Sequence, residues 1–191
     1  MKALEEKILA EGEVLPGEIL KVGSFFNQQI DVRFLMEMGG EIAGPFRSAG
    51  VTKVLTVESS GIALAVAAAH ALGVNAVFAK KSASANVSGD LYTAEVYSYT
   101  HKNTNMIYVS RDYITEDDCV LVVDDFLALG NAVNGLISLV AQAGAKLAGV
   151  SAGIEKGFQG GGDALRARGI RVESLAVIDA FAEDNTIRFR P

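Results

Sequence analysis

Two adjacent carboxylates, Asp124 and Asp125, end the apolar run of the segment VLVVDDFLALGNAV, residues 120–133. Carboxylates can accept hydrogen bonds from sugar hydroxyls or hold a metal ion, directly or through water. Gly130 permits close approach of a ligand to the backbone, and the start of the following helix offers amide groups to an anion. Acceptors for hydroxyl groups and donors for a phosphate therefore lie a few residues apart, which favours a phosphorylated sugar as the ligand.

The DD-x₄-G pattern alone leaves other interpretations open. The carboxylates can simply end a strand while Gly130 turns a corner. An apolar strand that ends in two aspartates can also hold Mg²⁺ in a nucleoside triphosphatase. That site needs a G-x-x-x-x-G-K-[ST] partner, which the sequence does not contain.

Length and composition narrow the class of protein. The chain has 191 residues, of which 50% are hydrophobic and 21% charged, as in one globular domain. Its net charge of −6 argues against a general nucleic-acid surface. A mean hydropathy of +0.28 hints at an apolar surface buried against a partner subunit. The single cysteine and two histidines argue against a structural zinc site.

No stretch has the length and apolar character of a membrane span, and the charged N-terminus lacks the apolar core of a secretory signal. We therefore expect a cytoplasmic protein that does not associate with membranes.

The elements that must position the carboxylates follow from hydrophobic periodicity. Apolar strands alternate with helices, which predicts an α/β fold with a mostly parallel central sheet covered by helices on both faces. In such sheets ligands bind outside the carboxyl ends of the strands. We expect strands at 17–23, 52–58, 75–81, 119–125, 146–155 and 171–181, a hairpin over 91–112, and helices at 4–12, 31–50, 62–73, 130–145 and 161–169.

Three segments carry a resemblance to a known family. The stretch VLVVDDFLALGNA resembles the phosphoribosyl-pyrophosphate motif of type I phosphoribosyltransferases, although Leu129 to Ala132 replace the usual Thr-Gly-Gly-Thr-like residues. The variant ALGNA, together with LKVGSFFNQQID (20–31) and IEKGFQGGGDALRARGI (154–170), resembles the bacterial xanthine phosphoribosyltransferases. The likeness covers essentially the whole chain.

The resemblance implies roles at the sugar end of the site. Asp124 and Asp125 would bind the ribose hydroxyls. Mg²⁺ would arrive bound to the sugar pyrophosphate, and the resemblance assigns it no direct protein ligand. The ammonium group of Lys81, which follows Lys80, would contact the pyrophosphate. The alternative is that both lysines are simply solvated. The polar segment 82–90 would be the family's flexible loop that closes over the reacting centre. The 5′-phosphate would lie on Ala128, Leu129, Gly130, Asn131 and Ala132, and the pyrophosphate on Glu58, Ser59, Ser60 and Gly61, which otherwise form a plain turn.

The resemblance also places the purine, with Leu20 and Asn27 on one side and Lys156 on the other. Lys156 only donates hydrogen bonds, so it favours an oxo group over an amine at the purine 6-position. Asn27 can donate to a second oxo group at the 2-position, and a 2,6-dioxo purine is xanthine. Phe158 could stack on the ring, although an ordinary core position is the alternative.

Taken together, the resemblance implies one phosphoribosyltransferase domain over 1–191, with a small hood built from the N-terminal and 156–170 segments. The implied activity is purine salvage: phosphoribosyl transfer from 5-phospho-α-D-ribose 1-diphosphate to xanthine, which gives XMP and pyrophosphate. A homodimer is implied. Two alternatives stay open, a non-catalytic ligand-sensing regulator of the same fold and an adenine-specific phosphoribosyltransferase.

Overall fold

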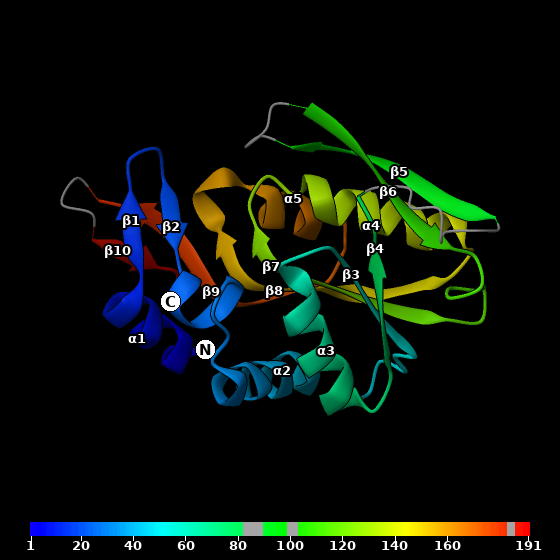
Figure 1. The fold of residues 1–191 in the computed structure, drawn as a ribbon, viewed down its shortest axis with the longest axis horizontal. Coiled ribbons are helices and arrows are strands. Elements are labelled where there is room, and N and C mark those ends of the chain that lie inside the picture. Colours follow the sequence, from blue (N-terminus) through cyan, green and yellow to red (C-terminus); the bar gives the residue numbers. More distant parts are fainter. Residues whose placement is uncertain (82–89, 99–102, 183–185) are drawn as a thin grey trace.

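A computed structural model describes residues 1–81, 90–98, 103–182 and 186–191 of the chain (Figure 1). Within these residues the central sheet has six strands in the order β10-β9-β8-β7-β3-β4. Neighbouring strands are parallel, except that β10 is antiparallel to β9. The prediction of a mostly parallel sheet is confirmed. The strands are β3 (Lys53–Val57), β4 (Asn75–Ala79), β7 (Cys119–Leu127), β8 (Lys146–Lys156), β9 (Val172–Phe181) and β10 (Ile187–Phe189).

Layers cover both faces of this sheet. One face packs on α2 (Val32–Phe46) and α3 (Gly61–Leu72), and the other on α4 (Asn131–Gln142) and the hairpin of β5 (Leu91–Ser98) and β6 (Asn103–Ser110). Successive residues of a strand point to opposite faces, so the apolar run of β7 divides between two cores. Leu121 and Val123 belong to the first core, and Val120 and Val122 to the second.

Local signals in the sequence set the start of α2 and the end of α3. The Asp31 carboxylate caps α2 by accepting a hydrogen bond from the Phe34 N–H at 3.1 Å. Gly73 ends α3 with a left-handed backbone, φ 72° and ψ 31°. The structure describes the N-terminal part of the chain as α1 (Lys2–Glu11), β1 (Glu13–Leu15), β2 (Ile19–Lys21) and a π-helical turn (Gly23–Asn27), and the segment after β8 as a 3₁₀ turn (Gly157–Gln159) and α5 (Gly161–Ala167).

Both chain ends gather at one end of the sheet. Figure 1 shows α1, the β1–β2 hairpin and β10 together beside β9, on the left of the view. There the Lys156 ammonium donates to the Glu18 carbonyl at 2.8 Å and joins the end of β8 to the N-terminal segment. None of the helices formed by the described residues has the length and apolar character needed to cross a membrane.

Three features differ from the prediction or lie beyond it. Strands β1 and β10 were not expected. Strand β7 does not end at Asp125 but continues to Leu127, because Phe126 and Leu127 still pair with Ile154 and Glu155 of β8. The flexible loop expected over 82–90 lies outside the described residues, apart from its last residue.

Candidate active site

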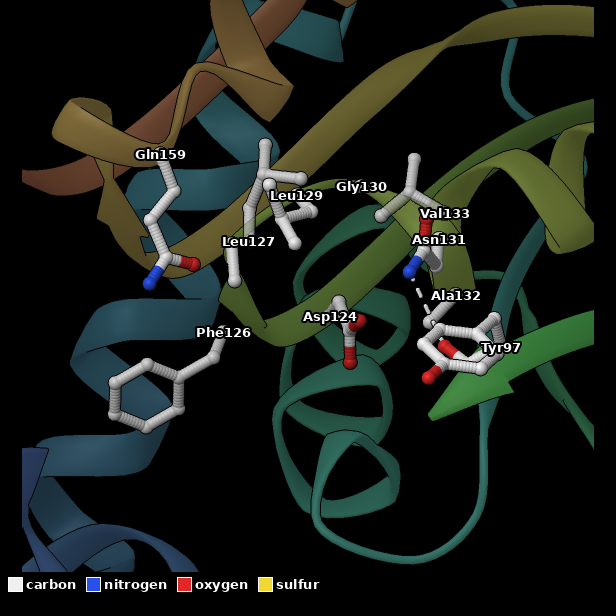
Figure 2. Close-up of a pocket in the computed structure, with 11 residues that line it drawn as sticks. Tyr97, Asp124, Phe126, Leu127, Leu129, Gly130, Asn131, Ala132, Val133 and Gln159 are labelled. Atoms are coloured by element: carbon white, nitrogen blue, oxygen red, sulfur yellow. Dashed lines mark hydrogen bonds between the residues drawn. The ribbon is translucent and has the colours of Figure 1, made fainter. Parts of the chain in front are cut away.

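A pocket of about 190 Å³ opens at the carboxyl end of β7 (Figure 2). Strand β7 and the loop that follows it supply most of the wall, while Tyr97 comes from β5 and Gln159 from the 3₁₀ turn. This is the edge where open α/β sheets bind ligands. The lining residues are Tyr97, Asp124, Phe126, Leu127, Ala128, Leu129, Gly130, Asn131, Ala132, Val133 and Gln159.

The loop at 128–130 leads into the N-terminus of α4. Gly130 adopts φ 83° and ψ 11°, a left-handed conformation that only glycine takes without strain. Its carbonyl accepts from both the backbone and the side-chain amide of Asn134, at 2.8 and 2.9 Å. The Asn131 side-chain amide donates to the Tyr97 carbonyl at 3.1 Å. The first N–H groups of α4 have no carbonyl partner within the helix, so they can donate to an anion in the pocket.

Asp124 lines the pocket but is only 5% exposed. Its Oδ1 accepts a hydrogen bond from the Asp125 N–H at 3.0 Å. Burial, and next the negative charge of Asp125, raise the pKa of Asp124 well above the ordinary aspartate value, while the positive charge of Lys81 opposes this shift. Asp125 is 8% exposed, and its side chain lies close enough to Asp124 for a direct side-chain interaction that adds to the rise in the Asp124 pKa.

Residues 58–61 lie beside Asp124. Glu58 Oε1 accepts from the Lys81 N–H at 2.5 Å, which ties the turn after β3 to the end of β4. A Cβ atom on Gly61 would lie 3.1 Å from Asp124 Oδ1 and closer still to Thr56 Oγ1. Ser59 and Ser60 are exposed. The structure therefore brings the turn and Lys81 to the pocket's carboxylate, although their separate roles stay predictions.

Of the residues expected at the base, Lys156 contacts the hairpin that contains Leu20, through its hydrogen bond to the Glu18 carbonyl. Burial lowers the pKa of Lys156, and the charge of Glu18 partly offsets this. Leu20, close to Glu18 in the same hairpin, is buried in the core. Asn27 is exposed at the end of the π-helical turn. Its neighbour Phe26 packs with a ring-centroid distance of 6.5 Å on the pocket residue Phe126.

Phe158 is partly buried and lies edge-on against Phe181, with ring centroids 5.4 Å apart. It contributes to the core at this end of the sheet. Stacking of Phe158 on a purine stays a prediction.

Sequence reasoning did not identify six residues that the fold brings to the site. Phe126, Leu127 and Val133 lie inside the segment 120–133 and could have been found there. Tyr97 and Gln159 carry no local signal, because the hairpin and the 3₁₀ turn reach the pocket only through the tertiary fold. Thr56 Oγ1, next to Gly61 and buried, has no hydrogen-bond partner among the described residues.

A metal ion at this site would take carboxylate oxygens as its protein ligands. Among the described ranges, no group of three or more His, Cys, Asp or Glu side chains could hold a metal ion. Asp124 offers hard oxygen ligands at the pocket, which fits Mg²⁺ bound by one or two carboxylates together with substrate phosphates.

Comparison with known proteins decides the family. The model of the phosphoribosyl transferase domain matches residues 36–160. Xanthine phosphoribosyltransferase of Bacillus cytotoxicus is 53% identical over 189 residues, which cover 99% of this chain and 95% of the relative. This chain belongs to the phosphoribosyltransferase family. The same enzyme from a Bacillus cereus strain matches with the same identity and coverage, so the resemblance predicted from the motifs is confirmed.

Solved phosphoribosyltransferases share the fold. Adenine phosphoribosyltransferase of Giardia lamblia, complexed with 9-deazaadenine, superposes with a TM-score of 0.76 at 21% identity, over 91% of this chain and 96% of that chain. The adenine enzyme of Rhodothermus marinus gives a TM-score of 0.72 at 23% identity, over 93% of this chain and 100% of that chain. At this level of identity the likeness concerns the fold alone.

Proposed function

We propose that this phosphoribosyltransferase acts in purine salvage and transfers the phosphoribosyl group of 5-phospho-α-D-ribose 1-diphosphate to xanthine, giving XMP and pyrophosphate. The observation that carries the proposal is 53% identity to xanthine phosphoribosyltransferases over 99% of the chain. The pocket supports it, because a carboxylate for sugar hydroxyls lies beside helix amides for a phosphate.

In the proposed reaction a purine ring nitrogen bonds to the anomeric carbon of the ribose as the bond from that carbon to the pyrophosphate oxygen breaks. Positive charge builds on the ribose ring during this exchange, and the purine loses a proton. Asp124 and Asp125 accept hydrogen bonds from the ribose hydroxyls and hold the sugar in place. The amides at residues 128–132 hold the 5′-phosphate, and residues 58–61 with Lys81 hold the pyrophosphate.

Mg²⁺ bound with the sugar diphosphate would neutralise charge on the leaving pyrophosphate. Asp124 and Asp125 are the carboxylates we assign to this end of the site. No protein nucleophile is needed for the transfer.

At the base, Lys156 donates to the 6-oxo group of xanthine and Asn27 to the 2-oxo group, with Leu20 and Phe158 on the ring. The N-terminal segment and residues 156–170 form a hood over the base, within one domain. The Lys156 hydrogen bond to the Glu18 carbonyl supports this arrangement. We further propose that the enzyme works in the cytoplasm as a homodimer.

The experiment that tests the proposal measures kcat/KM by pyrophosphate release with xanthine, guanine, hypoxanthine and adenine, for the natural enzyme and the double variant Asp124→Asn/Asp125→Asn. Xanthine should exceed adenine by about tenfold or more, because unpaired polar groups in the wrong complex cost about 1–3 kcal/mol. The double variant should lose at least about 100-fold, since a hydrogen bond to a charged acceptor contributes about 1.5–3 kcal/mol.

Adenine as the preferred base would contradict the xanthine assignment and favour the adenine-specific alternative. Near-natural activity in a folded double variant would remove the ribose role of the two aspartates. A protein that binds the sugar diphosphate but turns over no base would favour a ligand-sensing regulator.

A further inference from the structure

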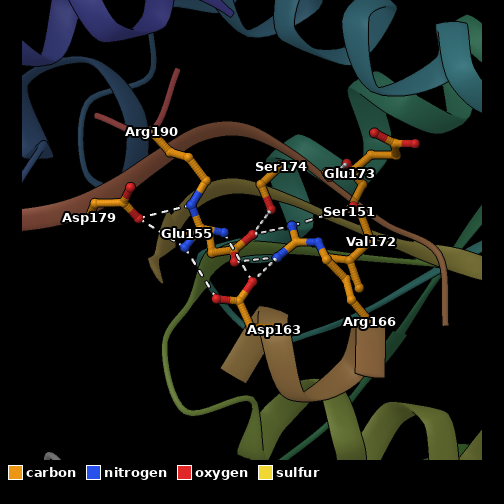
Figure 3. Close-up of polar contacts among 9 residues, drawn as sticks. All are labelled: Ser151, Glu155, Asp163, Arg166, Val172, Glu173, Ser174, Asp179 and Arg190. Carbon is orange, nitrogen blue, oxygen red and sulfur yellow. Dashed lines mark hydrogen bonds and ion pairs between the residues drawn. The ribbon is translucent and has the colours of Figure 1, made fainter. Parts of the chain in front are cut away.

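Glu155 is a fully buried carboxylate at the end of β8, next to the proposed base residue Lys156. Arg166 of α5 forms two hydrogen bonds with it, Nη1 to Oε1 at 2.8 Å and Nη2 to Oε2 at 2.7 Å (Figure 3). Ser174 Oγ donates to the same carboxylate at 2.5 Å. Removing two charged groups from water costs free energy that offsets much of the attraction between them. Apolar residues of similar volume often stabilise a fold equally well. The placement of this pair therefore calls for an explanation other than stability.

The pair belongs to a network that holds α5 in place. Arg166 also donates to Asp163 at 2.9 Å, and Asp163 accepts from Arg190 at 3.0 and 3.2 Å. Arg190 in turn donates to Asp179 at 2.9 Å. Helix α5 has only seven residues, too few for a helix that is stable by itself. Its position thus depends on these contacts with β8, β9 and the C-terminal segment.

The other side of α5 touches the proposed phosphate loop. The Gly161 N–H donates to the Ala128 carbonyl at 3.1 Å. A Cβ atom on Gly161 would lie 2.6 Å from the carbonyl carbon of Leu129 and 2.7 Å from the Gly130 nitrogen, so only glycine fits. A Cβ atom on the adjacent Gly162 would collide with the Glu155 carboxylate. The glycine pair is therefore packed between the buried carboxylate and the loop.

A second contact runs from the end of α5 to the same loop. Arg168 Nη1 donates to the side-chain oxygen of Asn134 at 2.6 Å, and the Asn134 amide donates to the Gly130 carbonyl at 2.9 Å. Two carbonyls of the loop, those of Ala128 and Gly130, are thus held from α5. Because each peptide unit is planar, fixing these carbonyls also fixes the orientation of the Leu129 and Asn131 N–H groups.

We propose that Glu155 and Arg166 are positioning residues that hold α5 against residues 128–130 and so keep the loop in its phosphate-binding conformation. This inference rests on the proposed phosphate role of residues 128–132. Neither residue lines the pocket, so both act through the glycine turn and Asn134. The base side has its own anchors, since Lys156 pairs with Ile178 of β9 and with the Glu18 carbonyl. Loss of the pair should therefore weaken binding of the sugar diphosphate far more than binding of the base.

The test compares Arg166→Met, Arg166→Lys and the double variant Glu155→Gln/Arg166→Met with Arg171→Met. The double variant leaves no unpaired charge buried, so it keeps the test valid if Arg166→Met alone does not fold. Arg171 is a matched control because it forms an ion pair with Glu173 at 2.9 Å, with half its side chain exposed and no described contact with the loop. Each folded variant is assayed for kcat, for KM of both substrates and for thermal unfolding.

We expect the folded double variant to raise the KM for the sugar diphosphate about tenfold and to change the KM for xanthine less than about threefold, because the two sites are anchored separately. Arg166→Lys should recover part of the loss, while Arg171→Met should leave both constants unchanged. An unchanged KM for the sugar diphosphate, or an equal rise in both constants, would overturn the positioning role.

A direct variant of the loop separates this inference from the proposed function. Gly130→Val places a branched residue at φ 83° and should raise the KM for the sugar diphosphate. If Gly130→Val raises the KM for the sugar diphosphate and the Glu155→Gln/Arg166→Met variant does not, only the positioning role of Glu155 and Arg166 is wrong. If Gly130→Val also leaves this constant unchanged, the phosphate role of the loop fails, and the inference fails with it.

Discussion

At the scale of single residues, Lys156 is the side chain from which we expect discrimination between oxo purines and adenine. Its ammonium has donors and no lone pair, and its present partner is a carbonyl oxygen, that of Glu18. A 6-oxo group offers the same kind of acceptor, whereas the 6-amino group of adenine would face the ammonium donor to donor. Burial lowers the pKa of Lys156, so it should lose its charge at a lower pH than an exposed lysine.

Lys156→Gln should therefore lose xanthine transfer and narrow the gap to adenine, because a glutamine amide can rotate to present an acceptor. The change in relative kcat/KM should be about tenfold to 100-fold, the cost of leaving a polar pair unsatisfied. Asn27→Ala is the companion variant and should reduce kcat/KM for xanthine more than for hypoxanthine, which has no 2-oxo group. An equal loss for all four bases in Lys156→Gln would show that this lysine serves the phosphates or the fold instead.

Asp124 gives a second residue-scale prediction, on stability. Its raised pKa means that the folded state favours the protonated carboxyl, so this group stabilises the fold at low pH. The contribution is lost as the pH rises through the raised pKa, where ionised Asp124 is buried beside Asp125. Asp124→Asn should thus unfold at a higher temperature than the natural protein at neutral and alkaline pH. This difference in unfolding temperature should become smaller as the pH falls toward the ordinary pKa of an aspartate.

The measurement is thermal unfolding of both proteins across pH 4 to 9. Asp117→Asn, at an exposed position, is the control and should change the free energy of unfolding by less than about 0.5 kcal/mol at each pH. A difference for Asp124→Asn that is the same at every pH would contradict the assignment of the raised pKa to Asp124.

At the scale of elements, the N-terminus of α3 packs so closely on β3 and β7 that Gly61 leaves no room for a methyl group. Gly61→Ala would push against Thr56 Oγ1 and Asp124 Oδ1, both buried. We expect it to destabilise the protein by about 1–3 kcal/mol, the usual cost of overpacking. It should also reduce kcat/KM, because it displaces the turn at 58–61 from Asp124.

Gly40→Ala is the matched control for this prediction. It lies inside α2 with open space around the position of a Cβ atom, so alanine should stabilise the helix by about 0.5–1 kcal/mol. Chemical denaturation of the two variants measures both effects. A Gly61→Ala variant as stable and active as the natural protein would show that α3 can shift without cost, and that this close contact does not position the turn.

The same elements show what could be predicted from sequence. The parallel strands and helices α2, α3 and α4 follow from local patterns, and their ends from the cap at Asp31 and the glycine at 73. Strands β1 and β10 have three residues each, and they form because a neighbouring strand offers a partner. The continuation of β7 to Leu127 likewise depends on pairing with β8.

The site likewise combines residues that a local pattern predicts with residues that only the tertiary fold brings together. Asp124 and the phosphate loop lie in one continuous segment, so their proximity could be predicted from the sequence. Tyr97 and Gln159 reach the pocket from a hairpin and a short turn that pack there only in the folded chain. The contact of Gly161 with Ala128 joins segments that are distant in sequence, and no local pattern indicates it.

At the scale of the whole molecule, the chain exposes several large apolar side chains. Val32 is 66% exposed, Val66 52% and Phe78 42%, and the mean hydropathy of the chain is +0.28. A net charge of −6 makes like chains repel one another, so we expect self-association to rest on apolar contact more than on charge. The proposed homodimer is thus expected to persist, or to strengthen, when salt screens that repulsion.

Sedimentation equilibrium should give about twice the chain mass of 20.1 kDa at low salt, and the same mass at about 1 M salt, where the screening length falls to about 3 Å. A dimer held mainly by ion pairs would instead dissociate over this range, because exposed pairs are weakened by screening. The mass of a single chain at both salt concentrations would contradict the homodimer. Transfer activity at such a mass would further show that the pocket between β7, β5 and the 3₁₀ turn is complete within one chain, because the dimer would then contribute nothing to the site.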